Sequence, residues 1–254
     1  MATLCNSRAT TKVPLPHSHS DAEKGKSDDH FDPFGPIRGH RGPGAFVVAQ
    51  LGQSLDGRIA TPTGESRWIN RDAALDHLHR LRAHVDAVMV GVGTVVADNP
   101  QLNVRRVEGR HPARVVIDPR GRLPAGMACM GACETRRLVV RGAPGPDAGP
   151  GVEEIVLPAV DGGIAPRAIL DALVARGLTR ILVEGGANTI SRFIDAGCID
   201  RLHVLVAPMI IGSGKTGLDL APIETLAGAL RPKTTVTVLA DGDVLFDCDL
   251  RSVA

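Results

Sequence analysis

The residues best suited to do chemistry lie in Ile181–Phe193, ILVEGGANTISRF. An apolar run ends at Glu184, two glycines follow, and a helical pattern begins. Glycine lets a ligand approach the backbone closely, and the free N–H groups of a helix N-terminus bind phosphate. Ligands of open α/β sheets bind outside the carboxyl ends of strands, where Glu184 is expected. The segment is therefore a candidate ligand site, although a tight turn without a ligand explains the glycines equally well.

Two other glycine-rich segments depart from the nucleotide motifs that they suggest. In GVGTVVADNP, residues 91–100, Val96 stands where a dinucleotide fingerprint needs Gly or Ala, and the proline leaves no room for a helix of useful length. GSGKT at 212–216 lacks the P-loop glycine, because position 209 is Met, and no sustained apolar helix follows. We expect neither a Rossmann fingerprint nor an NTPase.

Metal and hydrolase chemistry is not indicated. Cys129 and Cys133 have no second ligand pair, so two small core residues are the better interpretation. No G-x-S-x-G elbow is present for a serine hydrolase. Four histidines fall in a polar stretch without fixed ligand geometry, so we predict a solvated tail and no metal there: His17, His19, His30 and His40.

Composition limits the possible partners. The 254 residues are 43% hydrophobic and 22% charged, with a net charge of +1. A neutral body with one Trp and no Tyr argues against nucleic-acid binding. No apolar run is long enough for a membrane span, and the N-terminus lacks the apolar segment of a signal peptide. Five scattered cysteines do not form a disulfide framework. These features predict a cytoplasmic protein.

The elements that must position Glu184 alternate between strands and helices. Residues 1–44 are polar and predict a disordered tail, and residues 45–254 predict a single domain. Short apolar runs predict nine strands, at Phe46–Leu51, Ala87–Gly91, Arg114–Asp118, Arg137–Arg141, Glu153–Leu157, Arg180–Glu184, Arg201–Ile211, Thr235–Ala240 and Val244–Asp249.

Three amphipathic segments predict helices near 72–84, 166–177 and 187–196. Asn70 is the expected N-cap of the first helix, and Gly177 and Gly197 are expected to end the other two. This alternation predicts an α/β fold with a mostly parallel sheet covered on both faces. The DGD sequence at 241–243 predicts a hairpin, so the sheet should be mixed.

Three segments together resemble one family: Gln53–Asn70 with SLDG and GESRWIN, His79–Arg105 with GTVVADNPQLNVR, and Leu182–Gly214 with EGGA. In content and order they resemble the pyrimidine reductase of riboflavin biosynthesis, the reductase half of the bifunctional deaminase–reductase. The resemblance implies a dihydrofolate-reductase-like three-layer α/β/α fold, NADPH as cofactor, a phosphorylated ribosylamino-pyrimidine as substrate and a homodimer.

Matched positions imply the site residues. Substrate is expected at Ser66, Arg82, Leu102, Arg105 and Glu184. NADPH is expected at Gly52, Trp68, Thr94, Asp98, Gly186, Ala187, Asn188, Thr189, Ile190, Ser191 and Arg192. The guanidinium groups of Arg82 and Arg105 suit a dianionic phosphate, and the carboxylate of Glu184 suits the N–H groups of a pyrimidine. No side chain is a convincing general acid, so the catalytic residue stays unknown. Arg120 and Arg141 are the candidates for binding the cofactor's 2′-phosphate.

Two departures from the family pattern keep alternatives open. Gln50 stands where many of these reductases have Lys. This favours, as a second hypothesis, a reductase of a pterin, folate or other heterocycle on the same fold. A third hypothesis is a non-catalytic nucleotide-binding protein. The zinc deaminase half is expected to be missing, because residues 1–44 are too short and polar to form it, so deamination should take place on another chain.

Overall fold

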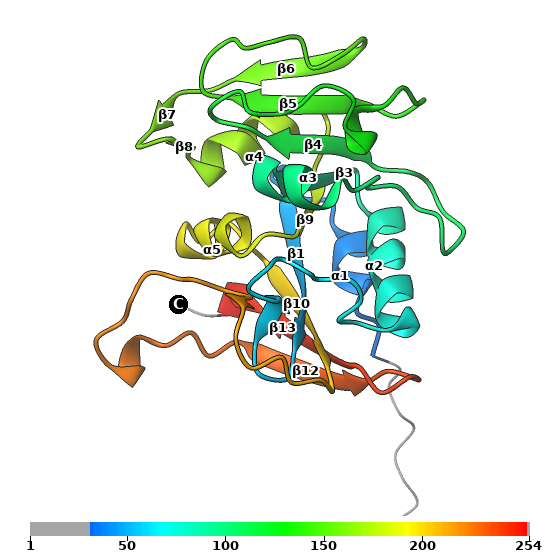
Figure 1. The fold of residues 1–254 in the computed structure, drawn as a ribbon, viewed down its shortest axis with the longest axis vertical. Coiled ribbons are helices and arrows are strands. Elements are labelled where there is room, and N and C mark those ends of the chain that lie inside the picture. Colours follow the sequence, from blue (N-terminus) through cyan, green and yellow to red (C-terminus); the bar gives the residue numbers. More distant parts are fainter. Residues whose placement is uncertain (1–30, 253–254) are drawn as a thin grey trace, which may run out of the picture. The chain divides into compact units, whose positions relative to one another are not determined.

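A nine-stranded sheet forms the centre of the fold. Its strands are β1 (Phe46–Ser54), β3 (Ala87–Gly91), β4 (Ala113–Ile117), β5 (Arg137–Arg141), β6 (Val152–Val156), β9 (Arg180–Glu184), β10 (Arg201–Ala207), β12 (Lys233–Val238) and β13 (Val244–Asp249). The order across the sheet is β12-β13-β10-β1-β9-β3-β4-β5-β6 (Figure 1). Pairing is parallel from β10 to β6, and β13 runs antiparallel to both of its neighbours. The predicted mixed, mostly parallel sheet is confirmed.

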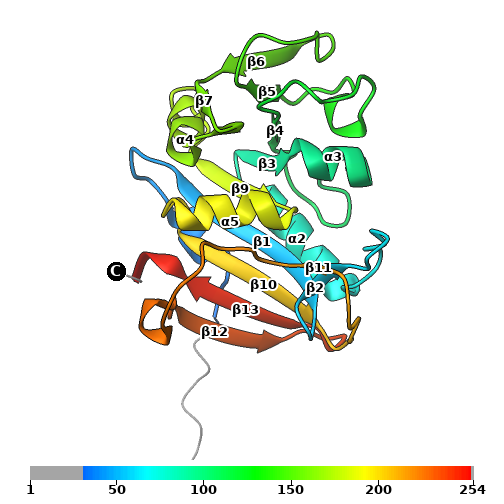
Figure 2. The same cartoon turned by 60° about the vertical axis from the view of Figure 1, so that its left-hand side comes forward.

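Helices cover both faces of this sheet. In β3, Ala87 and Met89 point to one face and Val88 and Val90 to the other, and all four are buried. Strands buried on both faces need this continuous apolar sequence. Helices α4 (Pro166–Val174) and α5 (Ala187–Asp195) pack on the first face (Figure 2).

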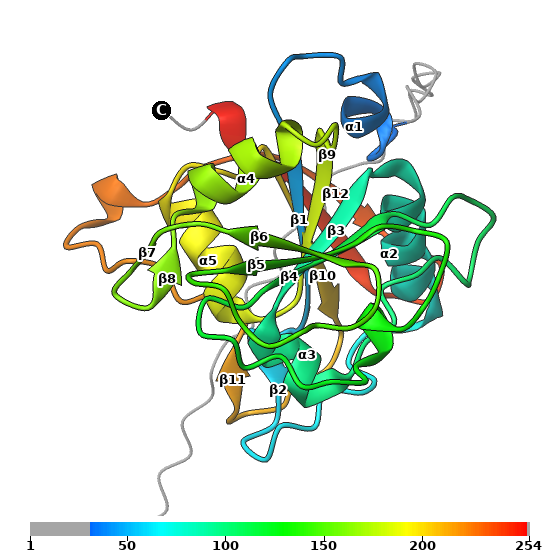
Figure 3. The same ribbon diagram turned by 90° about the horizontal axis from the view of Figure 1, so that it is seen from above.

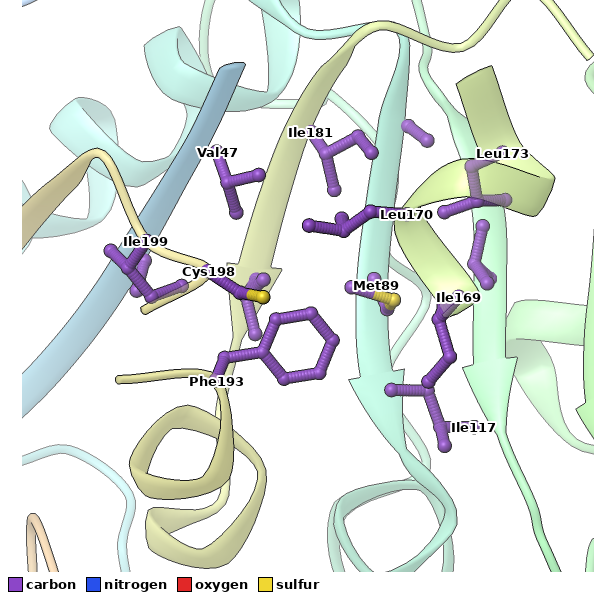
Figure 4. Packing of buried hydrophobic residues seen from close by; sticks show 14 of the residues in the cluster. Val47, Met89, Ile117, Ile169, Leu170, Leu173, Ile181, Phe193, Cys198 and Ile199 are labelled. Carbon is purple, nitrogen blue, oxygen red and sulfur yellow. The ribbon is translucent and has the colours of Figure 1, made fainter. Parts of the chain in front are cut away.

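Figure 4 shows Leu170 and Leu173 of α4 and Phe193 of α5 against the strand residues Ile181 and Met89. The other face carries α1 (Gly35–Gly39), α2 (Asp72–His84) and α3 (Val92–Asp98), seen from above in Figure 3. The predicted three-layer α/β/α architecture is confirmed.

The computed structural model describes residues 31–252, of which those from Pro33 on form one compact unit. The predicted tail boundary at residue 44 needs correction, because α1 lies before it and Ile37 of α1 is 1% exposed within the core. The Phe34 ring also packs at a tilt against the rings of His77 and His84 of α2. Residues 1–30 of the predicted tail, which include His17, His19 and His30, lie outside the described residues.

The N-terminus of α2 differs from the prediction. Arg71, not Asn70, is the N-cap position, and it makes no side-chain cap. Asp241 from the β12–β13 hairpin accepts a hydrogen bond from the backbone N–H of Ala73, at 2.7 Å. Asn70 instead donates to the carbonyl of Leu205 and to Asp243, both at 3.1 Å. A distant hairpin therefore caps this helix.

Several short elements were not predicted. Helix α3 begins directly after β3, although its seven residues end before Pro100. Strand β2 (Arg58–Ala60) pairs with β11 (Lys215–Thr216), and β7 (Ala159–Val160) pairs with β8 (Gly163–Ile164). Three 3₁₀ turns complete the described chain: η1 (Ala128–Met130), η2 (Leu226–Gly228) and η3 (Leu250–Ser252).

The strand predicted over Arg201–Ile211 ends at Ala207, and Ile210 is 74% exposed. The P-loop-like segment at 212–216 ends in strand β11. A true P-loop leads into a helix, so this segment is not one. In the part of the chain that the structure describes, no helix is long and apolar enough to cross a membrane.

Candidate functional site

Two adjoining cavities lie at the carboxyl ends of the parallel strands. The larger has a volume of about 1260 Å³ and the smaller about 280 Å³. Ile59, Ser66, Asp98 and Gly186 line both cavities, so the two adjoin each other at these residues. The carboxyl ends of β3, β4 and β9 contribute to them. This is where ligands of open α/β sheets bind.

Two glycines after β9 shape the wall between the cavities. Gly185 and Gly186 have φ values of 65° and 62°, a region that favours glycine. A Cβ on Gly186 would lie 2.9 Å from the Thr94 hydroxyl of α3, and one on Gly185 would lie 3.0 Å from its methyl. The pair therefore lets α3 and the N-terminus of α5 approach each other. The N–H groups of that helix end are suited to a phosphate.

The smaller cavity is lined by polar groups at the end of β1. A Cβ on Gly52 would lie 2.0 Å from the Asn70 side-chain oxygen, so that amide occupies the space beside the glycine. Gln50 is 8% exposed and lines the same cavity. Among the described residues, no hydrogen bond satisfies the Gln50 carboxamide. Trp68, 65% exposed, lies at the rim and is not a core residue.

Arg82 and Glu184 are joined to each other. Arg82 Nε donates to Glu184 Oε1 at 2.7 Å and Arg82 Nη2 donates to Oε2 at 2.6 Å. Arg82 Nη1 donates to the carbonyl of Asn103, at 2.9 Å. Both side chains are buried, so the arginine does not extend to solvent. The pair links α2, the end of β9 and the loop that follows α3.

That loop carries Leu102 and Arg105. Leu102 is buried, with a φ of 56°. The backbone N–H of Arg105 donates to His79 Nδ1 at 3.0 Å. Partial loss of hydration and the charge of Arg82 lower the pKa of the Arg105 guanidinium. A bound phosphate would relieve this repulsion.

Asp56 of the SLDG motif has a structural role. Its carboxylate accepts hydrogen bonds from the Ser54 hydroxyl at 2.6 Å, Gly212 N at 2.7 Å and Ile211 N at 3.1 Å. The Ser54 hydrogen bond, ahead of that from Ile211, lowers the pKa of Asp56 to about 2. The turn after β1 is thereby tied to the segment before β11.

The structure brings most of the predicted cofactor residues together. Gly52 and Trp68 line the smaller cavity, Asp98 and Gly186 line both, and the larger cavity adds Thr94, Ala187, Asn188, Thr189 and Arg192. Ile190 and Ser191 line neither. Ile190 is in the core, and the Ser191 hydroxyl accepts a hydrogen bond from Asp219 N at 2.8 Å. Their side chains therefore face away from both cavities.

The predicted substrate residues are more dispersed. Ser66 lines both cavities, whereas Arg82, Leu102, Arg105 and Glu184 line neither. Arg141 also lies outside, because its buried guanidinium is paired with Glu154 at 2.6 Å. Sequence reasoning missed Asn70 and the turn Gly162–Gly163. It gave Arg120 only as a candidate, although the end of β4 lies at the same sheet edge as Glu184.

Comparison with known proteins identifies the family of this chain. The family model described as the RibD C-terminal domain matches residues 45–242. The chain belongs to this family. The riboflavin biosynthesis protein RibD of Aquifex aeolicus is 32% identical over 203 residues, covering 79% of this chain and 57% of that protein. The chain thus spans a little over half the length of the RibD proteins that it matches.

A second relative matches over most of its own length. The 2,5-diamino-6-ribosylamino-4(3H)-pyrimidinone 5′-phosphate reductase of Methanothermobacter thermautotrophicus is 33% identical over 196 residues, covering 73% of this chain and 89% of that enzyme. The crystal structure of a deaminase/5-amino-6-(5-phosphoribosylamino)uracil reductase from Thermotoga maritima is 30% identical, with a TM-score of 0.70 over 82% of this chain and 57% of that one. The predicted family is confirmed.

Proposed function

We propose that this chain is an NADPH-dependent reductase that converts the ribosyl group of a 5-phosphoribosylamino-pyrimidine into a ribityl chain, a step of riboflavin biosynthesis. The observation that carries the proposal is the match to the archaeal pyrimidinone 5′-phosphate reductase along 89% of that enzyme. The proposed reduction breaks one bond of the sugar and forms two. The bond from the first sugar carbon to the ring oxygen breaks, a hydride adds to that carbon, and a proton adds to that oxygen.

The larger cavity fits a nicotinamide dinucleotide. Its volume of about 1260 Å³ exceeds the roughly 300–1,000 Å³ of pockets for drug-sized ligands. Gly186, Asn188 and Thr189 would hold the diphosphate at the N-terminus of α5. When bound, the reduced nicotinamide supplies the hydride. The region shared by the two cavities, at Ser66 and Asp98, would then contain the reacting ring.

The smaller cavity would accept the sugar and the pyrimidine. The unsatisfied carboxamide of Gln50 is well placed to hydrogen-bond the sugar oxygen that gains the proton. Arg105 would bind the substrate phosphate, with the Arg82–Glu184 pair holding its loop. We propose that water or the substrate itself supplies the proton. Ordering the two reactants and excluding water are then the main contributions of the protein.

A direct assay tests the function. The purified 254-residue chain is mixed with NADPH and 5-amino-6-(5-phosphoribosylamino)uracil, and the loss of reduced-nicotinamide absorbance is followed, with the ribityl product identified by mass. Turnover of this substrate, with none of dihydrofolate, supports the proposal. Binding of NADPH without oxidation on either substrate would instead indicate a non-catalytic nucleotide-binding protein.

We also propose a homodimer, which the family resemblance implies, and a cytoplasmic location, which the composition of the sequence predicts. Light scattering of the purified protein at micromolar concentration tests the dimer, whose expected mass is twice the 26.6 kDa of one chain.

A further inference from the structure

Both side-chain oxygens of Glu184 already have a partner. The sequence assigned this carboxylate to the N–H groups of a pyrimidine. In the structure Arg82 donates to Oε1 at 2.7 Å and to Oε2 at 2.6 Å, and neither residue lines either cavity. A side-chain acceptor for a substrate N–H therefore has to come from another residue. The smaller cavity offers acceptor oxygens on four side chains, those of Gln50, Ser66, Asn70 and Asp98.

Among these four, the amide of Asn70 is held in one orientation by hydrogen bonds. Its Nδ2 donates to the carbonyl of Leu205 and to the carboxylate of Asp243, both at 3.1 Å. The same carboxylate oxygen of Asp243 accepts a hydrogen bond from the backbone N–H of Arg71 at 2.8 Å. Turning the amide over would place its oxygen against two acceptors, so these partners fix which end is nitrogen. The oxygen is the end left for the cavity.

The Asn70 oxygen lies beside Gly52, at the end of β1. A Cβ on Gly52 would lie 2.0 Å from Asn70 Oδ1 and 4.0 Å from Gln50 Nε2, and all three residues line the smaller cavity. Within residues 31–252, no hydrogen bond reaches the Asn70 oxygen or the Gln50 amide. Ser66 and Asp98 belong instead to the region shared by the two cavities. An acceptor and a donor without protein partners therefore lie near one point of the smaller cavity.

We infer that Asn70 is a catalytic residue of the proposed reduction, and that its oxygen accepts the N–H that joins the pyrimidine to the sugar. The inference rests on the proposed function, which places the Gln50 amide on the sugar ring oxygen. That oxygen and this nitrogen are both bonded to the first sugar carbon, so a neighbouring donor and acceptor match them. The two amides together orient the reacting carbon toward the nicotinamide.

The acceptor matters most while the sugar ring opens. As the bond from the first carbon to the ring oxygen breaks, the nitrogen lone pair forms a double bond to that carbon, and the N–H becomes positively charged. The ring oxygen takes its proton from water or the substrate, as proposed above. Hydride addition to the carbon then returns the electron pair to nitrogen. Because a cationic N–H forms a stronger hydrogen bond than a neutral one, Asn70 stabilises the charged state more than the bound substrate.

Steady-state kinetics with 5-amino-6-(5-phosphoribosylamino)uracil and NADPH test this role. Dissociation constants for NADPH and for the product, 5-amino-6-(5-phosphoribitylamino)uracil, are measured beside them by calorimetry. Asn70→Leu and Asn70→Asp both lose the Nδ2 hydrogen bonds to Leu205 and Asp243, but only the second keeps an acceptor oxygen. Asn70→Ser, a smaller change that also withdraws the oxygen, keeps the test independent of the folding of one variant.

Arg71→Ala is the matched control. The Arg71 guanidinium donates to the carbonyl of Asp241 and so ties the start of α2 to the same hairpin as Asn70 does, but Arg71 lines neither cavity. Its loss loosens the same contact and leaves the Asn70 oxygen in place. The kcat/KM of this variant should stay within about twofold of wild type, since an exposed side chain on one helix end is removed.

The kcat/KM of Asn70→Leu and of Asn70→Ser is expected to fall about ten- to a hundredfold, the range of a hydrogen bond from a charged donor. Binding of the product, whose N–H is neutral, should weaken by a smaller factor, about two- to tenfold. NADPH binding should stay within about twofold. Asn70→Asp should recover most of the lost kcat/KM.

Equal losses in kcat/KM and in product binding would overturn the inference, because they would show an interaction that does not strengthen as the ring opens. Asn70→Asp no better than Asn70→Leu would also overturn it. NADPH binding weakened as much as kcat/KM would assign the oxygen to the nicotinamide amide instead. All three outcomes leave the reductase proposal intact. If the wild type does not oxidise NADPH with this pyrimidine, the proposed function fails together with the inference.

Discussion

Arg82 and Glu184 form a bidentate ion pair whose side chains are each 7% exposed, and the arginine also holds the carbonyl of Asn103. The sequence suggested separate contacts with the substrate for these two residues. In the structure each is the other's partner, and together they fix the loop that carries Arg105. Their first contribution is to position that loop.

Breaking this pair should destabilise the protein strongly. Arg82→Met and Glu184→Met are each expected to lower the free energy of unfolding by about 3–5 kcal/mol, because each leaves a buried charge unpaired. The double variant should lose less free energy of unfolding than the two single variants lose together. Urea unfolding of the four proteins measures this coupling. Additive and small losses would show that the two side chains are independent and well hydrated.

His79 makes stability depend on pH. Burial, and next the charge of Arg82, lower its pKa from 6.5 to about 4 in the folded protein. As the pH falls below about 6.5, the unfolded chain takes up a proton that the folded one does not, so stability is lost down to about pH 4. His79→Asn keeps an acceptor for Arg105 N but does not titrate. Between pH 6.5 and 5 it should lose roughly 2 kcal/mol less than wild type. The free energy of unfolding is measured by urea unfolding at each pH. An equal loss in the variant and the wild type would contradict this prediction.

Periodicity predicted the parts of the fold that pack apolar side chains. Strands β3, β5, β9 and β13 and helix α2 have the bounds that the sequence predicts, because apolar runs and amphipathic faces are local properties. Helix α1 was missed because Ile37 is its one buried residue, so the sequence shows no repeating apolar pattern there. The pairing of β2 with β11 was missed too, because residues more than 150 positions apart form it.

The candidate site was predictable only where a motif names it. The turn after β9 was found because a strand, two glycines and a helix follow one another. The β7–β8 turn and Arg120 belong to the same cavity, but no pattern in the chain connects them. The Arg82–Glu184 contact spans 102 positions, so two residues assigned to a ligand were in fact each other's partners.

Gln50 should affect turnover more than nucleotide binding. Its buried carboxamide lines the smaller cavity, beside the predicted reacting region. Gln50→Leu removes the donor and keeps the approximate volume, so we expect kcat to fall about ten- to a hundredfold for the phosphoribosylamino-pyrimidine, with the NADPH dissociation constant within about twofold. Gln50→Glu, of similar shape but without the N–H donor, is the matched comparison. A variant with unchanged kcat would remove Gln50 from the mechanism.

Gly91 packs against a neighbouring side chain, whereas Gly93 faces the space proposed for the ligand. A Cβ on Gly91 would lie 2.5 Å from the Thr189 hydroxyl, whereas a Cβ on Gly93 would have no atom within 4 Å. Gly93 lies within α3 and lines the larger cavity. Gly93→Ala should therefore stabilise the ligand-free protein by about 0.5–1 kcal/mol through helix propensity. Gly91→Ala should destabilise it.

The ligand should reverse this ranking for Gly93. If a dinucleotide fills the larger cavity, the new methyl occupies space that the ligand needs, so the thermal shift produced by NADPH should be smaller in Gly93→Ala than in wild type. Thermal unfolding with and without NADPH gives both quantities from one set of samples. If the variant is more stable but keeps the full thermal shift with NADPH, the dinucleotide does not bind beside α3. The proposal that the larger cavity holds the hydride donor would then be wrong.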